Sequence, residues 1–145
     1  MAVAAIAEWV RTGGDAEAPP SYATVTRLNF SHHGWGSKEV KLLSERVLAG
    51  CPALTELSLG FNSVGDKGVE ALCVAAKHGA LRKLERLYLV GNQIGPPGCD
   101  SLAAVLRAGV LPACSYINLA KNPDTEETRW VIEELLKPEV ERYGM

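Results

Sequence analysis

The feature that most constrains the fold of this chain is an eleven-residue motif that recurs in register. Residues 84–94 read L-x-x-L-x-L-x-x-N-x-I. Leu87 and Leu89 are two residues apart, so in a strand both point to one face, while the residues between and beside them point to the other. Asn92 follows where the chain turns, and a short amide side chain there can bond backbone groups that the bend leaves unpaired. The motif therefore predicts a short strand followed by a tight turn.

Three further stretches match this motif at intervals of 29 or 30 residues, beginning at Val25, Leu54 and Cys114. The fourth and sixth positions are apolar in every copy: Leu28 and Phe30, Leu57 and Leu59, Leu87 and Leu89, Ile117 and Leu119. The ninth position holds His33, Asn62, Asn92 and Asn122. Four copies in phase predict four strands that lie side by side and place equivalent residues in rows.

The second half of each repeat has the spacing of a helix, because apolar residues three and four apart share one helical face. These residues are Val40, Leu43 and Val47; Val69, Leu72 and Ala76; and Cys99, Leu102 and Leu106. Gly65, Gly68, Gly95 and Gly98 stand between strand and helix, where we expect a positive φ or a close approach of the backbone.

The period of about 29 residues and the G-[VC]-x-x-L segment resemble the ribonuclease-inhibitor-like class of leucine-rich repeats, to which ribonuclease inhibitor, the Ran GTPase-activating protein and the repeat domains of NOD-like receptors belong. The resemblance covers residues 25–136. It implies a right-handed α/β solenoid, the leucine-rich repeat horseshoe, with parallel strands on the concave side and helices on the convex side. The sequence departs from the pattern at His33, Cys114 and Asp124, all in outer repeats, which cap such a stack.

At 145 residues the chain is expected to be a single domain, residues 1–145. We divide it into an N-terminal cap helix (1–14), a linker (15–24), three repeats (25–53, 54–83 and 84–113), a C-terminal capping repeat (114–137) and a tail (138–145). Val3, Ile6 and Val10 mark one face of the first helix. The last helix is expected over residues 125–137, with Asp124 as its N-cap.

The composition argues against several classes of protein. A net charge of −2 and a pI of about 5.9 give no reason to expect nucleic acid or an anionic membrane surface as partner. No apolar run reaches the length of a membrane span. The apolar run from Ala2 to Ala7 follows no basic residue and is interrupted by Glu8, so a secretory signal is not expected. We expect a cytoplasmic protein.

The residues that could carry chemistry are better explained by the repeats. Cys51, Cys73, Cys99 and Cys114 form no closely spaced pair, so we expect core packing, with Cys99 and Cys114 at interior positions, and no metal site. A segment resembling a phosphate loop starts at Gly60, but Asp66 stands where the lysine belongs. His33 is expected to replace the turn asparagine. No catalytic constellation is present, so we expect neither an enzyme nor a cofactor.

The remaining candidate site is the concave strand face, which serves as the binding surface of a solenoid by geometry. Aromatic and arginine side chains are enriched where binding energy concentrates. The predicted partner-binding residues are Arg27, Asn29, Glu56, Ser58, Phe61, Arg86, Tyr88, Tyr116 and Asn118. The leading prediction is a protein-interaction module with a protein partner. The alternatives are a regulator of a partner enzyme, of the GTPase-activating or inhibitor type suggested by the resemblance, and a structural subunit of a large complex.

Overall fold

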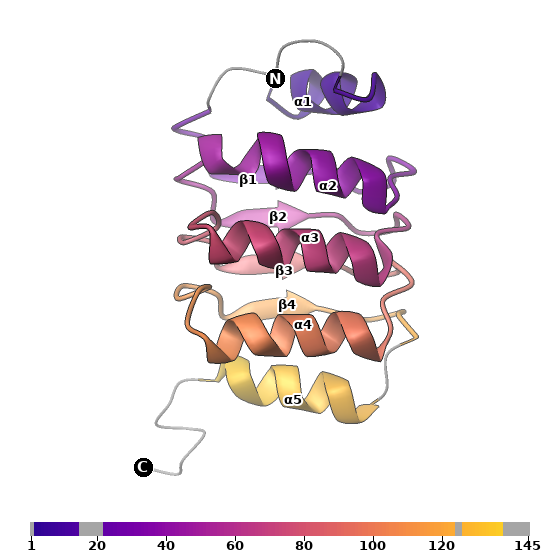
Figure 1. Ribbon diagram of the computed structural model, residues 1–145, viewed down its shortest axis with the longest axis vertical. Coiled ribbons are helices and arrows are strands. Elements are labelled where there is room, and N and C mark those ends of the chain that lie inside the picture. Colours follow the sequence, from indigo (N-terminus) through magenta and orange to yellow (C-terminus); the bar gives the residue numbers. More distant parts are fainter. Residues whose placement is uncertain (1, 15–21, 124–125, 138–145) are drawn as a thin grey trace.

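Helices and strands alternate along the chain in the computed structural model, which describes residues 2–14, 22–123 and 126–137 (Figure 1). The elements are α1 (Ala2–Arg11), β1 (Arg27–Asn29), α2 (Ser37–Arg46), the 3-10 helix η1 (Leu48–Gly50), β2 (Glu56–Ser58), α3 (Gly65–Lys77), β3 (Arg86–Tyr88), α4 (Pro96–Arg107), β4 (Tyr116–Asn118) and α5 (Glu126–Leu136). Most of the predicted linker, the predicted N-cap Asp124 and the predicted tail 138–145 lie outside the described residues.

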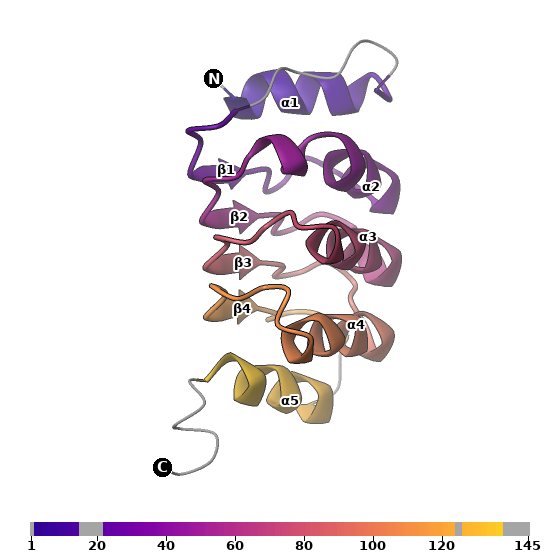
Figure 2. The ribbon, with the colours of Figure 1, turned by 60° about the vertical axis from the view of Figure 1, so that its left-hand side comes forward.

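The four strands form one parallel sheet in the order β1-β2-β3-β4. Their register places Leu28, Leu57, Leu87 and Ile117 in a single row. Figure 2 shows the strands stacked along one side and α2, α3 and α4 stacked along the other. The predicted α/β solenoid with parallel strands is confirmed.

The core lies between the sheet and the helices. The row that runs from Leu28 to Ile117 is buried, and a second buried row of Phe30, Leu59, Leu89 and Leu119 lies beside it. The helices close the interior with Val40, Leu43, Val69, Leu72, Cys99 and Leu102, all buried as their spacing predicts. Full burial of one such aliphatic side chain stabilises the fold by about 1.5–3 kcal/mol. Leu106 is half-buried, and Val105 beside it is fully buried in its place.

Helices cover the stack at both ends. Ile6, Trp9 and Val10 of α1 are buried, and α1 lies against α2 and β1. The guanidinium of Arg46 lies 5.3 Å from the ring centroid of Trp9, which ties α1 to α2. At the other end α5 packs on α4 and buries Ile132. The apolar edges of the first and last repeats are thereby removed from water.

Three of the four turn glycines have the positive φ or the close backbone approach that the sequence predicts. Gly65 has a φ of +66°, the left-handed region that suits glycine. A Cβ on Gly68 would collide with the side chain of Val64, and one on Gly98 would stand 2.7 Å from Cγ2 of Ile94. The prediction is wrong for Gly95, where φ is −102° and a Cβ would find its nearest neighbour at 3.6 Å.

Candidate interaction face

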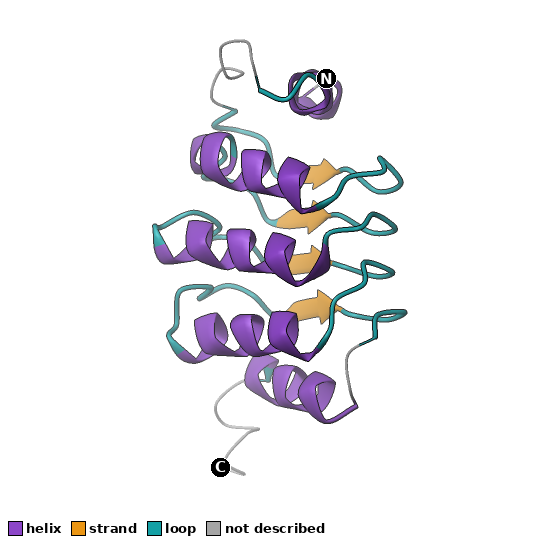
Figure 3. Ribbon diagram, turned by 45° about the vertical axis from the view of Figure 1, so that its right-hand side comes forward, coloured by secondary structure: helices purple, strands orange, loops and turns teal. Residues whose placement is uncertain are grey.

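The outer face of the sheet is open on the side opposite the helices, as the strands of Figure 3 show. In each strand the middle residue is buried and its two neighbours are exposed or half-exposed. The neighbours are eight of the nine predicted site residues: Arg27, Asn29, Glu56, Ser58, Arg86, Tyr88, Tyr116 and Asn118. We call this set the strand face. The structure therefore brings these eight residues together in two rows across the sheet.

The first row of the strand face carries charge of alternating sign. The register pairs Arg27 with Glu56, Glu56 with Arg86, and Arg86 with Tyr116. Within the described part of the chain, no ion pair joins Glu56 to either arginine. These charged groups can therefore bind groups of a partner without first breaking an internal contact.

The second row combines turn-forming and aromatic residues. The Oδ1 atoms of Asn29 and Asn118 accept hydrogen bonds from the backbone N–H groups of Ser31 and Ala120, at 2.9 and 3.0 Å. These two asparagines therefore shape the ends of their strands, in addition to standing on the open face. The hydroxyl of Ser58 lies 2.7 Å from that of Ser31.

Two tyrosines form an aromatic patch on the strand face. The ring centroids of Tyr88 and Tyr116 are 5.6 Å apart, and the rings are tilted by 59°. This arrangement lies in the range that aromatic pairs prefer. Tyr116 is 43% exposed, and Arg86 stands beside it in register. The pair presents a broad apolar surface whose hydroxyl groups suit a partly wet interface.

The ninth predicted residue, Phe61, belongs to a separate row along the rim, where the chain leaves the strands. The ring of Phe61 stacks on His32, with centroids 4.7 Å apart and planes 10° apart. On its other side the ammonium of Lys121 lies 5.6 Å from the Phe61 centroid. Gly91 stands between, and a Cβ there would be 3.0 Å from Phe61 Cδ1. His32 and Lys121 were not among the predicted site residues, and the missing side chain at position 91 was the signal for this contact.

An asparagine ladder holds the turns beneath this rim. Asn62 accepts hydrogen bonds from the backbone N–H groups of His33 and Trp35, at 2.9 and 3.0 Å. Asn92 accepts from Val64 N and donates to Leu59 O, at 3.1 and 2.8 Å. Asn122 accepts from the N–H groups of Asn92 and Ile94. Each amide therefore binds the backbone of the preceding repeat, as well as its own turn.

His33 takes the equivalent position in the first repeat and keeps the local contact. Its Nδ1 lies 2.9 Å from the carbonyl oxygen of Ser31, two residues back. Each of the three asparagines makes the same bond, for example Asn92 to Val90. Within the described residues His33 makes no contact with a preceding repeat, because α1 and not a strand precedes β1. This confirms His33 as the replacement for the turn asparagine.

The cysteines lie in the interior, with one correction. Cys51, Cys73 and Cys99 are buried, whereas Cys114 is half-buried. Cys114 precedes β4, the last strand of the described sheet, and its Sγ lies 3.8 Å from the carbonyl oxygen of Tyr116. Burial raises the pKa of the Cys51 and Cys114 thiols, and it raises that of Cys73 to about 11. These thiols are therefore protonated and unreactive near neutral pH.

Among the described residues, no three histidine, cysteine or acidic side chains are grouped so that they could hold a metal ion. No described helix is both long enough and apolar enough to cross a bilayer.

A family model described as "Leucine Rich repeat" matches residues 50–73 and 80–103. These two segments contain β2 and β3 with the beginnings of α3 and α4. They cover the asparagines Asn62 and Asn92 of the ladder described above.

Relatives of this chain include human and rat proteins. The human protein "NACHT, LRR and PYD domains-containing protein 13" is 34% identical over 87 residues, which is 59% of this chain and 8% of the relative. "NACHT, LRR and PYD domains-containing protein 3" of Rattus norvegicus is 43% identical over 60 residues, 41% of this chain and 6% of the relative. The chain thus spans less than a tenth of the length of these relatives.

A solved structure shares the fold. The C-terminal domain of tropomodulin from Caenorhabditis elegans superposes with a TM-score of 0.62. The match covers 99% of this chain and 96% of that domain, at 14% sequence identity. At this level of identity the likeness concerns the fold alone.

Proposed function

This chain belongs to the leucine-rich repeat proteins, and from this premise we propose that it is a non-enzymatic module that binds a protein partner through the strand face. The observation that carries the proposal is the aromatic patch of Tyr88 and Tyr116 beside the exposed guanidinium of Arg86. Tyrosine and arginine are enriched among the residues that dominate protein interfaces. Solenoids use this side of the repeat as an extended binding surface.

The charge pattern of the strand face supports a selective contact. Arg27, Glu56 and Arg86 alternate in sign across three neighbouring strands. A partner whose surface carries the complementary order of acidic, basic and acidic groups would gain affinity and a fixed register. A partner with the opposite order would place like charges against each other.

The rim extends the proposed site beyond the strands. Phe61 is 42% exposed and is held between His32 and Lys121. A ring held on both sides loses little conformational freedom when a partner covers it, so its apolar area can contribute to affinity. Phe61 therefore stays within the proposed site, and His32 and Lys121 join it.

The proposal includes a cytoplasmic location. Cys51 and Cys73 are buried free thiols, and Cys114 is also a free cysteine. Unpaired cysteines suit a reducing compartment. The net charge of −2 supports a protein as partner rather than nucleic acid.

Affinity purification from the source cell tests the proposal, with the wild-type chain and an Arg86→Ala/Tyr88→Ala double variant as baits. Both side chains are at least partly exposed, so the double variant should fold. We expect a protein recovered with the wild type to be reduced about tenfold or more with the double variant. A control variant, Lys77→Ala/Arg107→Ala, changes exposed residues on α3 and α4 and should recover the partner at wild-type level. Equal recovery with all three baits would contradict the proposal.

A further inference from the structure

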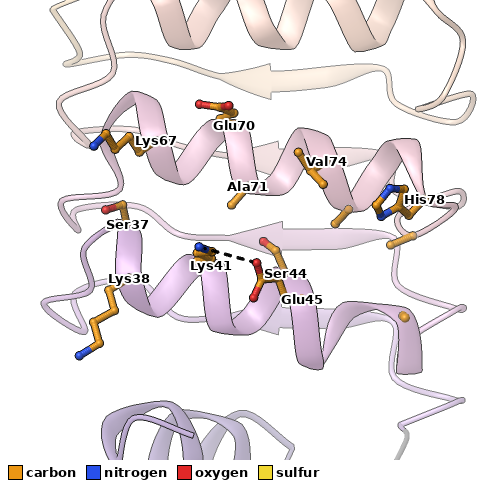
Figure 4. Close-up of a pocket in the computed structure, with 13 residues that line it drawn as sticks. Ser37, Lys38, Lys41, Ser44, Glu45, Lys67, Glu70, Ala71, Val74 and His78 are labelled. Carbon is orange, nitrogen blue, oxygen red and sulfur yellow. Dashed lines mark ion pairs between the residues drawn. The ribbon is translucent and has the colours of Figure 1, made fainter.

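A groove of about 570 Å³ lies between α2 and α3 on the side of the molecule opposite the strand face (Figure 4). Its walls include Ala71, Val74 and Ala75, and Val74 is 42% exposed. The volume falls in the range of sites that enclose a side chain or small ligand. The groove therefore offers apolar surface that nothing in the described chain covers.

Small side chains open the groove at this helix pair. The buried residues Leu43, Leu72 and Leu102 fix the register of the three helices. In that register Ser44 and Ala75 of the groove correspond to Cys73 and Val105 of the next pair, α3 and α4. Ala75 is smaller than Val105, which leaves room for the groove between α2 and α3.

One polar atom inside the groove has no partner. The hydroxyl of Ser44 is buried, and the described residues offer its Oγ no hydrogen bond. Ser44 lines the groove. A buried hydroxyl is normally hydrogen-bonded, so this atom points to a ligand that brings an N–H or O–H donor.

The groove is also basic at one end. Lys38 and Lys67 line it near the amino-terminal ends of α2 and α3, where the helix dipoles add positive potential, and Lys41 lines it at the middle of α2. Two carboxylates line it as well. Glu45 pairs with Lys41 at 4.0 Å, as the dashed line in Figure 4 marks, and Glu70 lies on the α3 side, with His78 at the far end. A ligand with acidic groups beside an apolar body fits this distribution.

Such a ligand is present on the chain itself. Trp130 on α5 is 60% exposed, more than Phe61, Val74 or Tyr116, the other large apolar side chains exposed among the described residues. In the register of the repeats it stands where the other helices carry Lys41, Glu70 and Asp100. Exposed Glu126, Glu127 and Glu133 lie within one helical turn of it.

We propose that Trp130 of one copy of this chain inserts into the groove between α2 and α3 of a second copy. The indole ring packs on Ala71, Val74 and Ala75, and its N–H donates to Oγ of Ser44. A buried indole N–H needs such an acceptor. The glutamates beside Trp130 then lie near Lys38 and Lys67. Within one molecule α4 separates α5 from the groove, so the contact forms between molecules (Figure 1).

The two surfaces differ, so the association is head-to-tail. A tryptophan side chain buries about 150–250 Å², well below the area of a stable standard interface. The self-association is therefore weak and depends on concentration. It does not use the strand face, so its outcome is independent of the proposed function.

Sedimentation equilibrium of the 145-residue chain tests this proposal over about 10 to about 500 µM, a range that suits a small interface. We expect the average mass of the wild type to rise above the monomer mass of 15.5 kDa as concentration increases. Trp130→Ala should stay at the monomer mass throughout. The matched control is Tyr116→Ala, which removes an exposed aromatic from the strand face and should associate like the wild type. A wild type that stays monomeric, or a Trp130→Ala variant that associates equally, overturns the proposal.

Mixing two variants tests the direction of the contact. Ala71→Phe should fill the groove and give a monomer on its own. Mixed with Trp130→Ala, which keeps an open groove, it should form a dimer of one copy of each and nothing larger. Circular dichroism checks that Ala71→Phe folds. If it does not fold, Lys67→Glu, a change at an exposed residue, replaces it. The Lys67→Glu variant should self-associate more weakly than the wild type, but not lose self-association. The proposal is contradicted if Ala71→Phe folds and its mixture with Trp130→Ala remains monomeric. It is also contradicted if Lys67→Glu self-associates as strongly as the wild type.

Discussion

Asp66 in α3 accepts a hydrogen bond of 2.9 Å, through Oδ1, from the backbone N–H of Gly98 in α4. The same oxygen accepts a bond of 2.8 Å from Gly95 N. Pro96 and Pro97 begin α4 and have no N–H, so Gly98 carries the first free donor of that helix. Gly95 has no side chain that could cap α4. The carboxylate of one repeat therefore supplies the N-cap of the next.

Removing this carboxylate should destabilise the stack. We expect Asp66→Ala to lower the free energy of unfolding by about 0.5–2 kcal/mol, the usual effect of losing an N-cap side chain. Asp66→Asn keeps an acceptor oxygen but loses the charge at the helix amino terminus, so its effect should be smaller, about 0.3–1 kcal/mol. Urea denaturation of the three proteins measures both values. Equal stability of Asp66→Ala and the wild type would contradict the capping role.

The asparagine ladder gives a second prediction. Asn92 is fully buried and binds backbone groups of Val64, Leu59 and Val90. Asn92→Ala leaves the N–H of Val64 without its acceptor, whereas Leu59 O keeps the bond from Asn62 and Val90 O keeps the bond from Phe61 N. The loss should cost about 1–3 kcal/mol. Ser63→Ala changes an exposed residue beside Val64, in the turn of the preceding repeat, and should stay within about 0.5 kcal/mol of the wild type. If Asn92→Ala and Ser63→Ala unfold at the same denaturant concentration, the asparagine ladder contributes little to the stability of the fold.

The buried thiol of Cys73 predicts a dependence of stability on alkaline pH. Burial raises the pKa of Cys73 from 9.0 to about 11 in the folded protein. The protonated thiol is thus favoured by folding, and its contribution is complete below pH 9 and lost as pH rises toward 11. The loss amounts to about 2 kcal/mol. Cys73→Ala should lack this component, so its unfolding free energy should fall less between these pH values. If the free energy of unfolding falls equally with pH in both proteins, the Cys73 thiol does not contribute to this pH dependence.

The sequence predicted the features that repeat. Alternating leucines specify which side of each strand is buried, and the period specifies which residues lie side by side, so the sequence alone predicts that Leu57 pairs with Leu87. The positions of the strand-face residues follow from the same alternation. Asn62 and Asn92 could be assigned to the turns for the same reason.

Contacts that occur once were beyond this reasoning. The bond between Asp66 and Gly98 spans 32 residues and depends on the close approach of two helices, to which no periodic pattern applies. His32, Phe61 and Lys121 hold equivalent positions in three repeats, so the period aligns them, but whether their side chains touch across Gly91 depends on the turn geometry. Cys114 packs against the core at its predicted interior position but is only half-buried, and the pattern does not show how well the last strand is covered.

The central claim is that the four repeats stack in register and bury one row of aliphatic side chains from Leu28 to Ile117. Leu87 lies in the middle of this row, between Leu57 and Ile117, and is buried. Denaturant unfolding of Leu87→Ala tests the claim most directly. The account predicts a loss of about 2–5 kcal/mol, seen as a lower transition midpoint. A midpoint equal to that of the wild type would contradict it.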